Sequence, residues 1–140
     1  MLQIASIKKE EMGEKFLSDL HKSTFNSEVD GSFFRFDGCL IAKNEEDDLV
    51  SYVLVRELSS EAAEIAWGGT SKKYRGINTK NAFDLFVDHI HKSYENVTFQ
   101  AWNQNYPMLK LGLYKGFKIV GCRTTNTGDL FVIFNKKRGE

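Results

Sequence analysis

The chain has 140 residues, with 19 basic and 19 acidic side chains that give a formal net charge of zero at pH 7. Apolar residues make up 41% of it and aromatic residues 13%, which excludes a disordered chain. The balanced charge excludes a protein drawn to nucleic acids or membranes by its overall field. Its length predicts one globular domain over residues 1–140.

The first residues, the cysteines and the histidines indicate a cytoplasmic protein without a metal. Residues 1–12 lack the long apolar core of a signal peptide, and the longest apolar runs are too short to span a bilayer. Cys39 and Cys122 lie in apolar segments without metal-ligand spacing, which favours two buried thiols over a disulfide or a metal site. His89 and His91 stand two residues apart on a predicted helix and therefore cannot share a metal. We expect no metal, no membrane partner and no nucleic-acid partner.

The first part of the chain predicts a strand, a helix and a hairpin. Residues 2–7 favour a strand, and an amphipathic helix follows, with an apolar face formed by Met12, Phe16, Leu17 and Leu20. An irregular segment at 23–38 is rich in phenylalanine. Strands at 39–42 and 49–58 then flank an acidic turn at 44–48, which predicts a hairpin.

The middle of the chain predicts a strand, a basic loop and a helix. A strand at 63–67 is followed by Gly68 and Gly69 and leads into the loop SKKYRGINTKNA, which opens a helix at 82–94. Helix N-termini present unpaired N–H groups and a partial positive charge. The basic residues around this terminus are Lys72, Lys73, Arg75 and Lys80. The loop therefore predicts an anion site, and its form is suited to phosphate groups.

The last part predicts a strand, a short helix and a second hairpin. The strand covers 96–102, the short helix lies in the segment YPMLKLGLYKGF, and the hairpin strands cover 118–124 and 129–135. The full order is β-α-β-β-β-α-β-α-β-β. This order predicts an α/β fold with a mixed sheet and helices packed against it.

The basic loop resembles the phosphate loop of the GCN5-related N-acetyltransferase (GNAT) family, Q/R-x-x-G-x-G/A. Arg75 takes the leading basic position, with Asn78 and Lys80 where the family has glycines. A register led by Lys73 would match Gly76 instead. We prefer the Arg75 register because it puts apolar residues at the family's apolar helix positions. Asn78 tolerates a left-handed backbone better than other non-glycine residues, which suits a position where the family has glycine.

The segment after the strand 96–102 resembles a second family motif, N-x-x-A-x-x-L-Y-x-x-x-G-F. Its matches here are Asn105, Met108, Leu111, Gly116 and Phe117. Gly112 stands where the family has its tyrosine, the usual general acid. Tyr114 lies two residues further on, about 200° around a helix, so we expect it to face away from the thiol and to be a packing residue. The general acid is therefore left unassigned, and we expect a gap at Gly112 that admits water or part of the acceptor beside the sulfur.

The resemblance implies the GNAT acyl-CoA N-acyltransferase fold, with acetyl-CoA as cosubstrate. The residues implied to bind it are Gly68, Gly69, Thr70, Arg75, Gly76, Ile77, Asn78, Thr79, Lys80 and Asn105. Gly68 and Gly69 indicate a β-bulge or a close approach of pantetheine, with a simple turn out of the sheet as the alternative. Asn105 either binds the amides of pantetheine or caps the short helix.

The reaction that the resemblance implies is transfer of an acetyl group to a primary amine by direct attack in a ternary complex. The amine must lose a proton before it attacks. Glu64 is the candidate general base, because it lies on the strand that leads to the two glycines. The alternatives are a solvated edge glutamate or an ion-pair partner for Lys or Arg. The acidic turn is expected at the cofactor end, because its strand runs antiparallel to that of Glu64.

The acceptor is expected to be a small-molecule or peptide amine. The aromatic segment from Phe33 to Phe36 is the candidate wall of the acceptor site, and Trp102 is interpreted as a core residue rather than a wall of the cleft. A second hypothesis is a catalytically degenerate protein of the same fold that binds acyl-CoA or a protein partner, which Gly112, Asn78 and Lys80 favour. A homodimer is compatible with either hypothesis.

Overall fold

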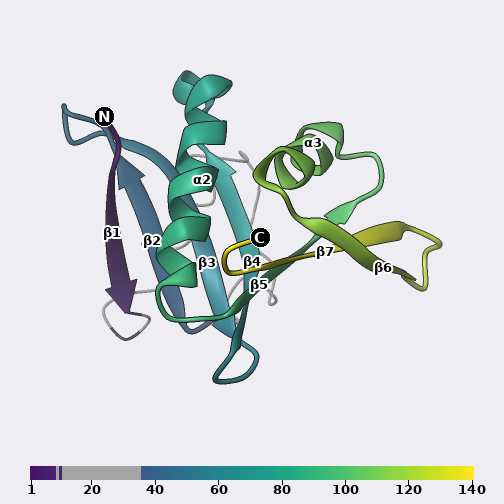
Figure 1. Ribbon diagram of the computed structural model, residues 1–140. Coiled ribbons are helices and arrows are strands. Elements are labelled where there is room, and N and C mark those ends of the chain that lie inside the picture. The colour runs from purple at the N-terminus through teal and green to yellow at the C-terminus, as the bar shows by residue number, and fades with distance from the viewer. Residues whose placement is uncertain (9, 11–35) are drawn as a thin grey trace.

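The computed structural model describes residues 1–8, 10 and 36–140. The predicted first helix, Phe33 and Phe34 lie outside the described residues. Within the described residues, seven strands form one sheet in the order β1-β2-β3-β4-β5-β7-β6 (Figure 1). The strands are β1 (Gln3–Lys8), β2 (Gly38–Lys43), β3 (Leu49–Glu57), β4 (Ala62–Thr70), β5 (Asn96–Trp102), β6 (Lys118–Thr124) and β7 (Leu130–Lys137). The helices are α2 (Ile77–His91) and α3 (Tyr106–Lys115), with a short 3-10 turn at Lys72–Tyr74.

The pairing of the strands confirms the predicted mixed sheet. Five of the six described pairs are antiparallel, and the pair β4–β5 is parallel. Because parallel strands need a crossover, α2 connects β4 to β5 across one face of the sheet. The predicted hairpins appear as β2–β3 and β6–β7.

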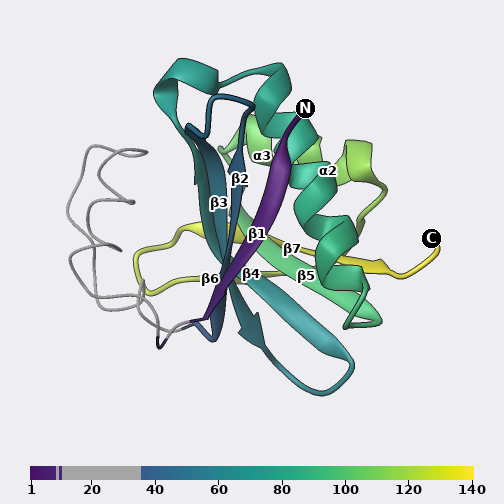
Figure 2. The ribbon, with the colours of Figure 1, turned by 90° about the vertical axis from the view of Figure 1, so that its left-hand side faces the viewer.

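Both helices pack on the same face of the sheet, as Figure 2 shows from the side. The buried side of α2 carries Ala82, Phe83, Phe86, Val87 and Ile90, at the spacing of one helical face. Phe99 of β5 is the centre of the aromatic packing, with its ring centroid 5.7 Å from Phe83 and 4.7 Å from Phe134. Met108, Leu109 and Leu111 of α3 join the same cluster. A second cluster on the opposite face contains Phe36, Cys39, Ile41, Tyr52 and Leu54.

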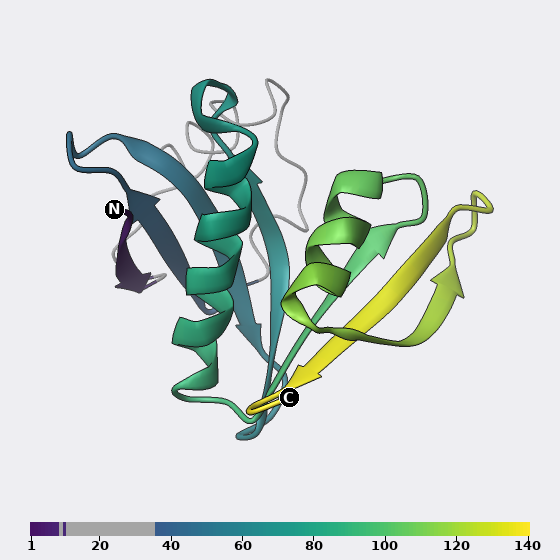
Figure 3. The same ribbon diagram turned by 45° about the horizontal axis from the view of Figure 1, so that its top comes forward.

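The sheet divides between β4 and β5. These strands pair over four residues, from Ala62↔Asn96 to Ile65↔Phe99. Beyond that point β4 stays with β3 as far as Thr70, and β5 stays with β7 as far as Trp102. Figure 3 shows the two halves diverging, with α2 above one and α3 above the other. The divergence begins at a β-bulge, because Leu54↔Trp67 is followed by Val55↔Ile65 and Ala66 has no partner on β3.

Several local predictions were wrong. Helix α2 begins at Ile77 rather than at residue 82, so the second half of the predicted loop is its first turns. Strand β4 continues through both glycines to Thr70, which excludes the simple turn out of the sheet. Cys122 and Trp102 are exposed, because β6 is an edge strand and Trp102 ends β5 beyond the core. Cys39 is buried as predicted, and burial raises the pKa of its thiol to about 12.

Candidate functional site

The candidate site lies where β4 separates from β5 and the chain enters α2. The Ser71 N–H donates to the Val50 carbonyl at 2.8 Å, so this residue directs its backbone groups toward β3. Backbone direction alternates along a strand, and Gly68 and Thr70 therefore direct theirs toward the side that β5 has left. The Thr70 carbonyl accepts from Arg75 Nε at 3.3 Å. Beyond Ile65 this side of β4 is therefore not paired with β5, and the Thr70 carbonyl is held by Arg75.

Gly68 of β4 has a role in the packing of the sheet. A Cβ atom added to Gly68 would lie 3.0 Å from Val53 Cγ1 and 3.1 Å from the Tyr52 carbonyl oxygen. A side chain there would push β3 away by a few tenths of an ångström, so glycine favours close packing on β3. The bulge lies at Ala66, before the glycines. The Thr70 hydroxyl lies 3.2 Å from that of Ser51 and its carbonyl accepts from Arg75, so its N–H is the group that could contribute to a site.

The N-terminus of α2 directly follows the basic residues Lys72, Lys73 and Arg75. Gly76 is the N-cap, with a φ of 105° that favours glycine, and it provides no side-chain cap. The Thr79 N–H donates to the Gly76 carbonyl at 3.0 Å, whereas the N–H groups of Ile77 and Asn78 have no acceptor earlier in the helix. Lys72 and Lys73 are exposed on the preceding turn. Asn78 is helical and not left-handed, so the reason proposed for an asparagine at this position was wrong.

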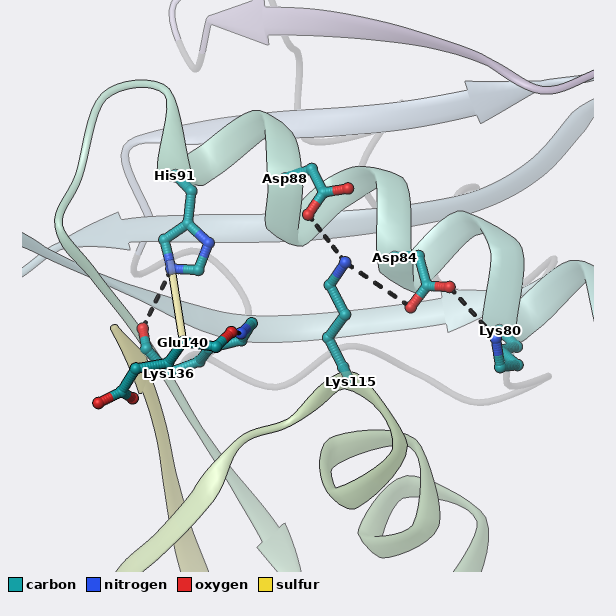
Figure 4. A network of polar contacts seen from close by, with 7 residues as sticks. All are labelled: Lys80, Asp84, Asp88, His91, Lys115, Lys136 and Glu140. Atoms are coloured by element: carbon teal, nitrogen blue, oxygen red, sulfur yellow. Dashed lines mark hydrogen bonds and ion pairs between the residues drawn. The ribbon is translucent and has the colours of Figure 1, made fainter. Parts of the chain in front are cut away.

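Lys80 belongs to a chain of ion pairs that joins the two helices (Figure 4). Its Nζ lies 3.3 Å from Asp84 Oδ2 on the next turn of α2. Lys115, at the end of α3, lies 3.9 Å from Asp84 Oδ1 and 2.8 Å from Asp88 Oδ1. The Lys80 ammonium is therefore held by a carboxylate on α2, in place of the compact glycine of the family motif. Further along α2, His91 is buried and its Nε2 lies 3.1 Å from the Lys136 carbonyl oxygen.

The acidic turn between β2 and β3 lies beside the basic loop, as predicted. Tyr74 Oη donates to Asp48 Oδ2 at 2.6 Å, which connects the tip of the hairpin to the 3-10 turn before α2. The side chain of Asn44 holds the turn by accepting from the N–H groups of Glu46 and Asp48, each at 3.0 Å. Negative charge therefore lies at the same end of the sheet as the basic loop and the N-terminus of α2.

Glu64 lies on β4 just before the bulge, and its side chain is 11% exposed. It faces Arg56 directly across β3–β4, and the two side chains form an ion pair. The structure therefore agrees with the alternative in which Glu64 has an arginine partner, and excludes a solvated edge glutamate. Sequence analysis missed Arg56. Its signal was the antiparallel register between 49–58 and 63–67, which places residues 56 and 64 opposite each other.

Asn105 caps α3, which was one of its two predicted roles. Its Oδ1 accepts from the Met108 N–H at 3.3 Å. The residue is exposed, so its Nδ2 group is open to solvent. Pro107 in the first turn and Gly116 at the C-cap, with a φ of 94°, define the two ends of this helix. The alignment of the second motif therefore agrees with the ends of α3.

Gly112 is buried in α3, and the gap expected beside it is absent. A Cβ atom there would lie 2.8 Å from Phe99 Cζ and 3.1 Å from Phe134 Cδ1. Two core rings occupy the space, so neither water nor acceptor has room at this position. Tyr114 turns away from this face as predicted, but it is 77% exposed and is not a packing residue. Phe36, by contrast, is 4% exposed and packs in the second cluster, so it is a core residue rather than an open wall.

Comparisons with known proteins identify the fold. No protein-family model matches the chain, and no curated protein matches it. Among solved structures, a GNAT family acetyltransferase from Elizabethkingia anophelis with acetyl-CoA bound has a TM-score of 0.69 at 16% identity, covering 97% of both chains. The chain has the GNAT fold.

Other GNAT-fold structures are similar over almost the whole chain. Mutant forms of the spermidine/spermine N-acetyltransferase SpeG from Vibrio cholerae have a TM-score of 0.73 at 12% identity, covering 99% of this chain and 95% of theirs. The ribosomal-protein-S18-alanine N-acetyltransferase from Escherichia coli has a TM-score of 0.69 at 12% identity, covering 98% of this chain and 94% of its own.

Two predicted absences concern membranes and metals. No helix among residues 1–8, 10 and 36–140 has the length and apolar content needed to cross a bilayer. Within the same residues, no group of three or more His, Cys, Asp or Glu side chains is arranged to hold a metal ion.

Proposed function

We propose that the protein is an N-acetyltransferase that transfers an acetyl group from acetyl-CoA to a primary amine, by direct attack in a ternary complex. The observation that carries the proposal is the end of β4–β5 pairing at Ile65↔Phe99, at a bulge that leads into a basic helix N-terminus. An extended pantetheine arm needs free backbone partners, and a pyrophosphate needs N–H groups and cations. Both are present within one short segment of the chain, from residue 66 to residue 80.

The roles proposed for the residues follow from these positions. Acetyl-CoA supplies the activated acetyl group. The backbone of Gly68, Gly69 and Thr70 holds the pantetheine arm, the segment from Arg75 to Lys80 holds the phosphates, and Asn105 offers its side-chain amide from α3. Glu64 removes a proton from the ammonium form of the acceptor, which makes the amine nucleophilic. Backbone N–H groups of β4 polarise the carbonyl that the amine attacks.

A second candidate function is a protein of the same fold that binds acyl-CoA or a protein partner without catalysis. The burial of Gly112 beneath Phe99 and Phe134 favours it, because no side chain at this position of α3 can act as the acid. The ion pair that holds Lys80 on Asp84 favours it as well.

A screen of amine acceptors for release of the CoA thiol separates the two functions. The panel should include polyamines, amino acids, aromatic amines and peptides with free N-termini. We expect amine-dependent thiol release with at least one class, at a rate proportional to enzyme concentration. Acetyl-CoA binding without thiol release from any class would favour the non-catalytic function.

Replacing Arg75 with alanine is expected to weaken acetyl-CoA binding by about 1–3 kcal/mol, the contribution of a charge-assisted hydrogen bond. Calorimetric titration of wild type and variant measures the difference. Lys92→Ala, an exposed cation beyond the other end of α2, is the matched control and should leave the affinity unchanged. Equal losses in both variants would indicate a general charge effect and remove Arg75 from the site.

Replacing Tyr114 with phenylalanine should leave turnover within a few-fold of wild type. The side chain is exposed on the outer side of α3, so removal of its hydroxyl alters neither the site nor the core, and stability should change by less than about 0.5 kcal/mol. Steady-state kinetics with the best acceptor and urea denaturation check both statements. A hundredfold loss of turnover with intact acetyl-CoA binding would show that the alignment of α3 is incorrect.

A further inference from the structure

The carboxylate of Glu64 has a single recorded partner among the described residues, and that partner is Arg56. Nη2 of Arg56 contacts Oε1 of Glu64, and within residues 1–8, 10 and 36–140 no hydrogen bond or ion pair reaches Oε2. The neighbour of Glu64 on the other side, Thr98, does not compete for it, because its hydroxyl donates to the Phe134 carbonyl at 2.6 Å. One oxygen of the carboxylate is therefore held, and the other is left for a proton, an ammonium group or water.

The backbone fixes both members of this pair. Glu64 lies in the short stretch of β4 that pairs on both sides, with Arg56 of β3 and Thr98 of β5. The end of β3 is held by Asp37, whose N–H donates to the Val55 carbonyl at 2.8 Å and whose Oδ2 accepts from the Glu57 N–H at 2.7 Å. Arg56 is thus held near the end of β3. Its partner Glu64 lies one residue before Ile65, the last residue of β4 that pairs with β5.

The pair is poorly explained as a device for stability. The Glu64 side chain is 11% exposed but that of Arg56 is 41% exposed, and an ion pair with a solvated partner contributes little to stability. Arg56 Nε is buried and has no hydrogen-bond partner within the described residues, so one N–H donor of the guanidinium lacks an acceptor there. An apolar cross-strand pair would stabilise the sheet equally well at this position. A function that needs an oriented carboxylate explains why Arg56 and Glu64 are there instead.

We propose that Arg56 is the positioning residue for Glu64, holding one carboxylate oxygen so that the other is directed at the acceptor amine. This inference rests on the proposed function. In this role Arg56 does not contact acetyl-CoA. Its contribution is the orientation of the base, which affects the rate of the chemical step rather than the binding of the cosubstrate.

A double-mutant cycle tests the proposal, with wild type, Arg56→Gln, Glu64→Gln and the double variant. Turnover and KM are measured with the best acceptor from the screen, and acetyl-CoA affinity is measured by calorimetry. We expect Arg56→Gln to lower kcat by about 10–100-fold, the loss caused by a misplaced catalytic group, with unchanged acetyl-CoA affinity. In the Glu64→Gln background the same change should lower kcat no further. Arg56→Lys should recover part of the loss, because it keeps the charge without the fork of donors.

The outcomes separate this inference from the proposed function. Arg123→Gln is the control, because Arg123 is an exposed arginine on β6 that also faces a neighbouring strand. If the wild type acetylates an amine and Arg56→Gln has the same kcat, the inference is wrong and the proposed function stands. Losses that multiply in the double variant overturn it as well, since they show that Arg56 acts independently of Glu64. A wild-type chain that acetylates no amine contradicts the proposed function itself.

Discussion

Replacing Glu64 with glutamine is expected to lower turnover by about 10²–10⁴-fold, the usual contribution of a positioned general base. Glutamine keeps the size of the side chain and can still accept a hydrogen bond from Arg56, but it cannot take a proton from an ammonium group. Acetyl-CoA affinity should be unchanged, because the residue lies before the bulge and the cosubstrate segment lies after it. Steady-state kinetics and calorimetric titration of the same preparations measure the two quantities.

Glu61→Gln is the matched control for this change. Glu61 is exposed on the turn just before β4, so it carries the same charge near the same strand without facing the site. Its replacement should leave turnover within a few-fold of wild type. Equal turnover in Glu64→Gln and wild type would remove Glu64 from the mechanism and would remove with it the reason for a positioning role of Arg56.

Replacing Gly112 with tyrosine restores the residue that the family motif has at this position, but it is expected to destabilise the protein and to give no gain in turnover. A Cβ atom alone would approach Phe99 Cζ to 2.8 Å, and the stacked rings of Phe99 and Phe134 leave no room for it to shift freely. Overpacking of this kind costs about 1–3 kcal/mol for added methylene groups, and a phenol should reach or exceed the upper value. Urea denaturation measures the loss.

Gly121→Ala is the comparison for this prediction. The nearest atom to a Cβ atom there is Ile133 Cδ1 at 3.9 Å, which is ordinary contact, so stability should change by less than about 0.5 kcal/mol. Wild-type stability together with raised turnover in Gly112→Tyr would show that α3 lies differently and that position 112 faces the thiol.

The order of elements was predictable because each element has a strong local signal. The apolar spacing of residues 82–90 gives α2, the Asn105-Tyr-Pro sequence gives the start of α3, and alternating apolar residues give both hairpins. The start of α2 was placed five residues late, because Ile77, Asn78 and Thr79 have weak helix propensity and the tertiary structure overrides it.

The details of the site depended on contacts between distant residues, which local patterns do not contain. The glycines at 68 and 69 suggested a bulge, yet the bulge lies at Ala66, where no residue type marks it. Gly112 suggested a gap, whereas the rings of Phe99 and Phe134 fill that space from other strands. Predicting the partner of Glu64 required the register of β3 against β4. Alternation of apolar and polar residues indicates which face of a strand is buried, but it does not fix which residues pair across two strands.

Calorimetric titration of the wild-type chain with acetyl-CoA tests the central claim most directly, because every proposed role depends on a bound cosubstrate at the divergence of β4 and β5. We predict saturable binding with one site per chain, weakened by Arg75→Ala and unaffected by Lys92→Ala. The absence of any binding heat with acetyl-CoA at millimolar concentration would contradict the account.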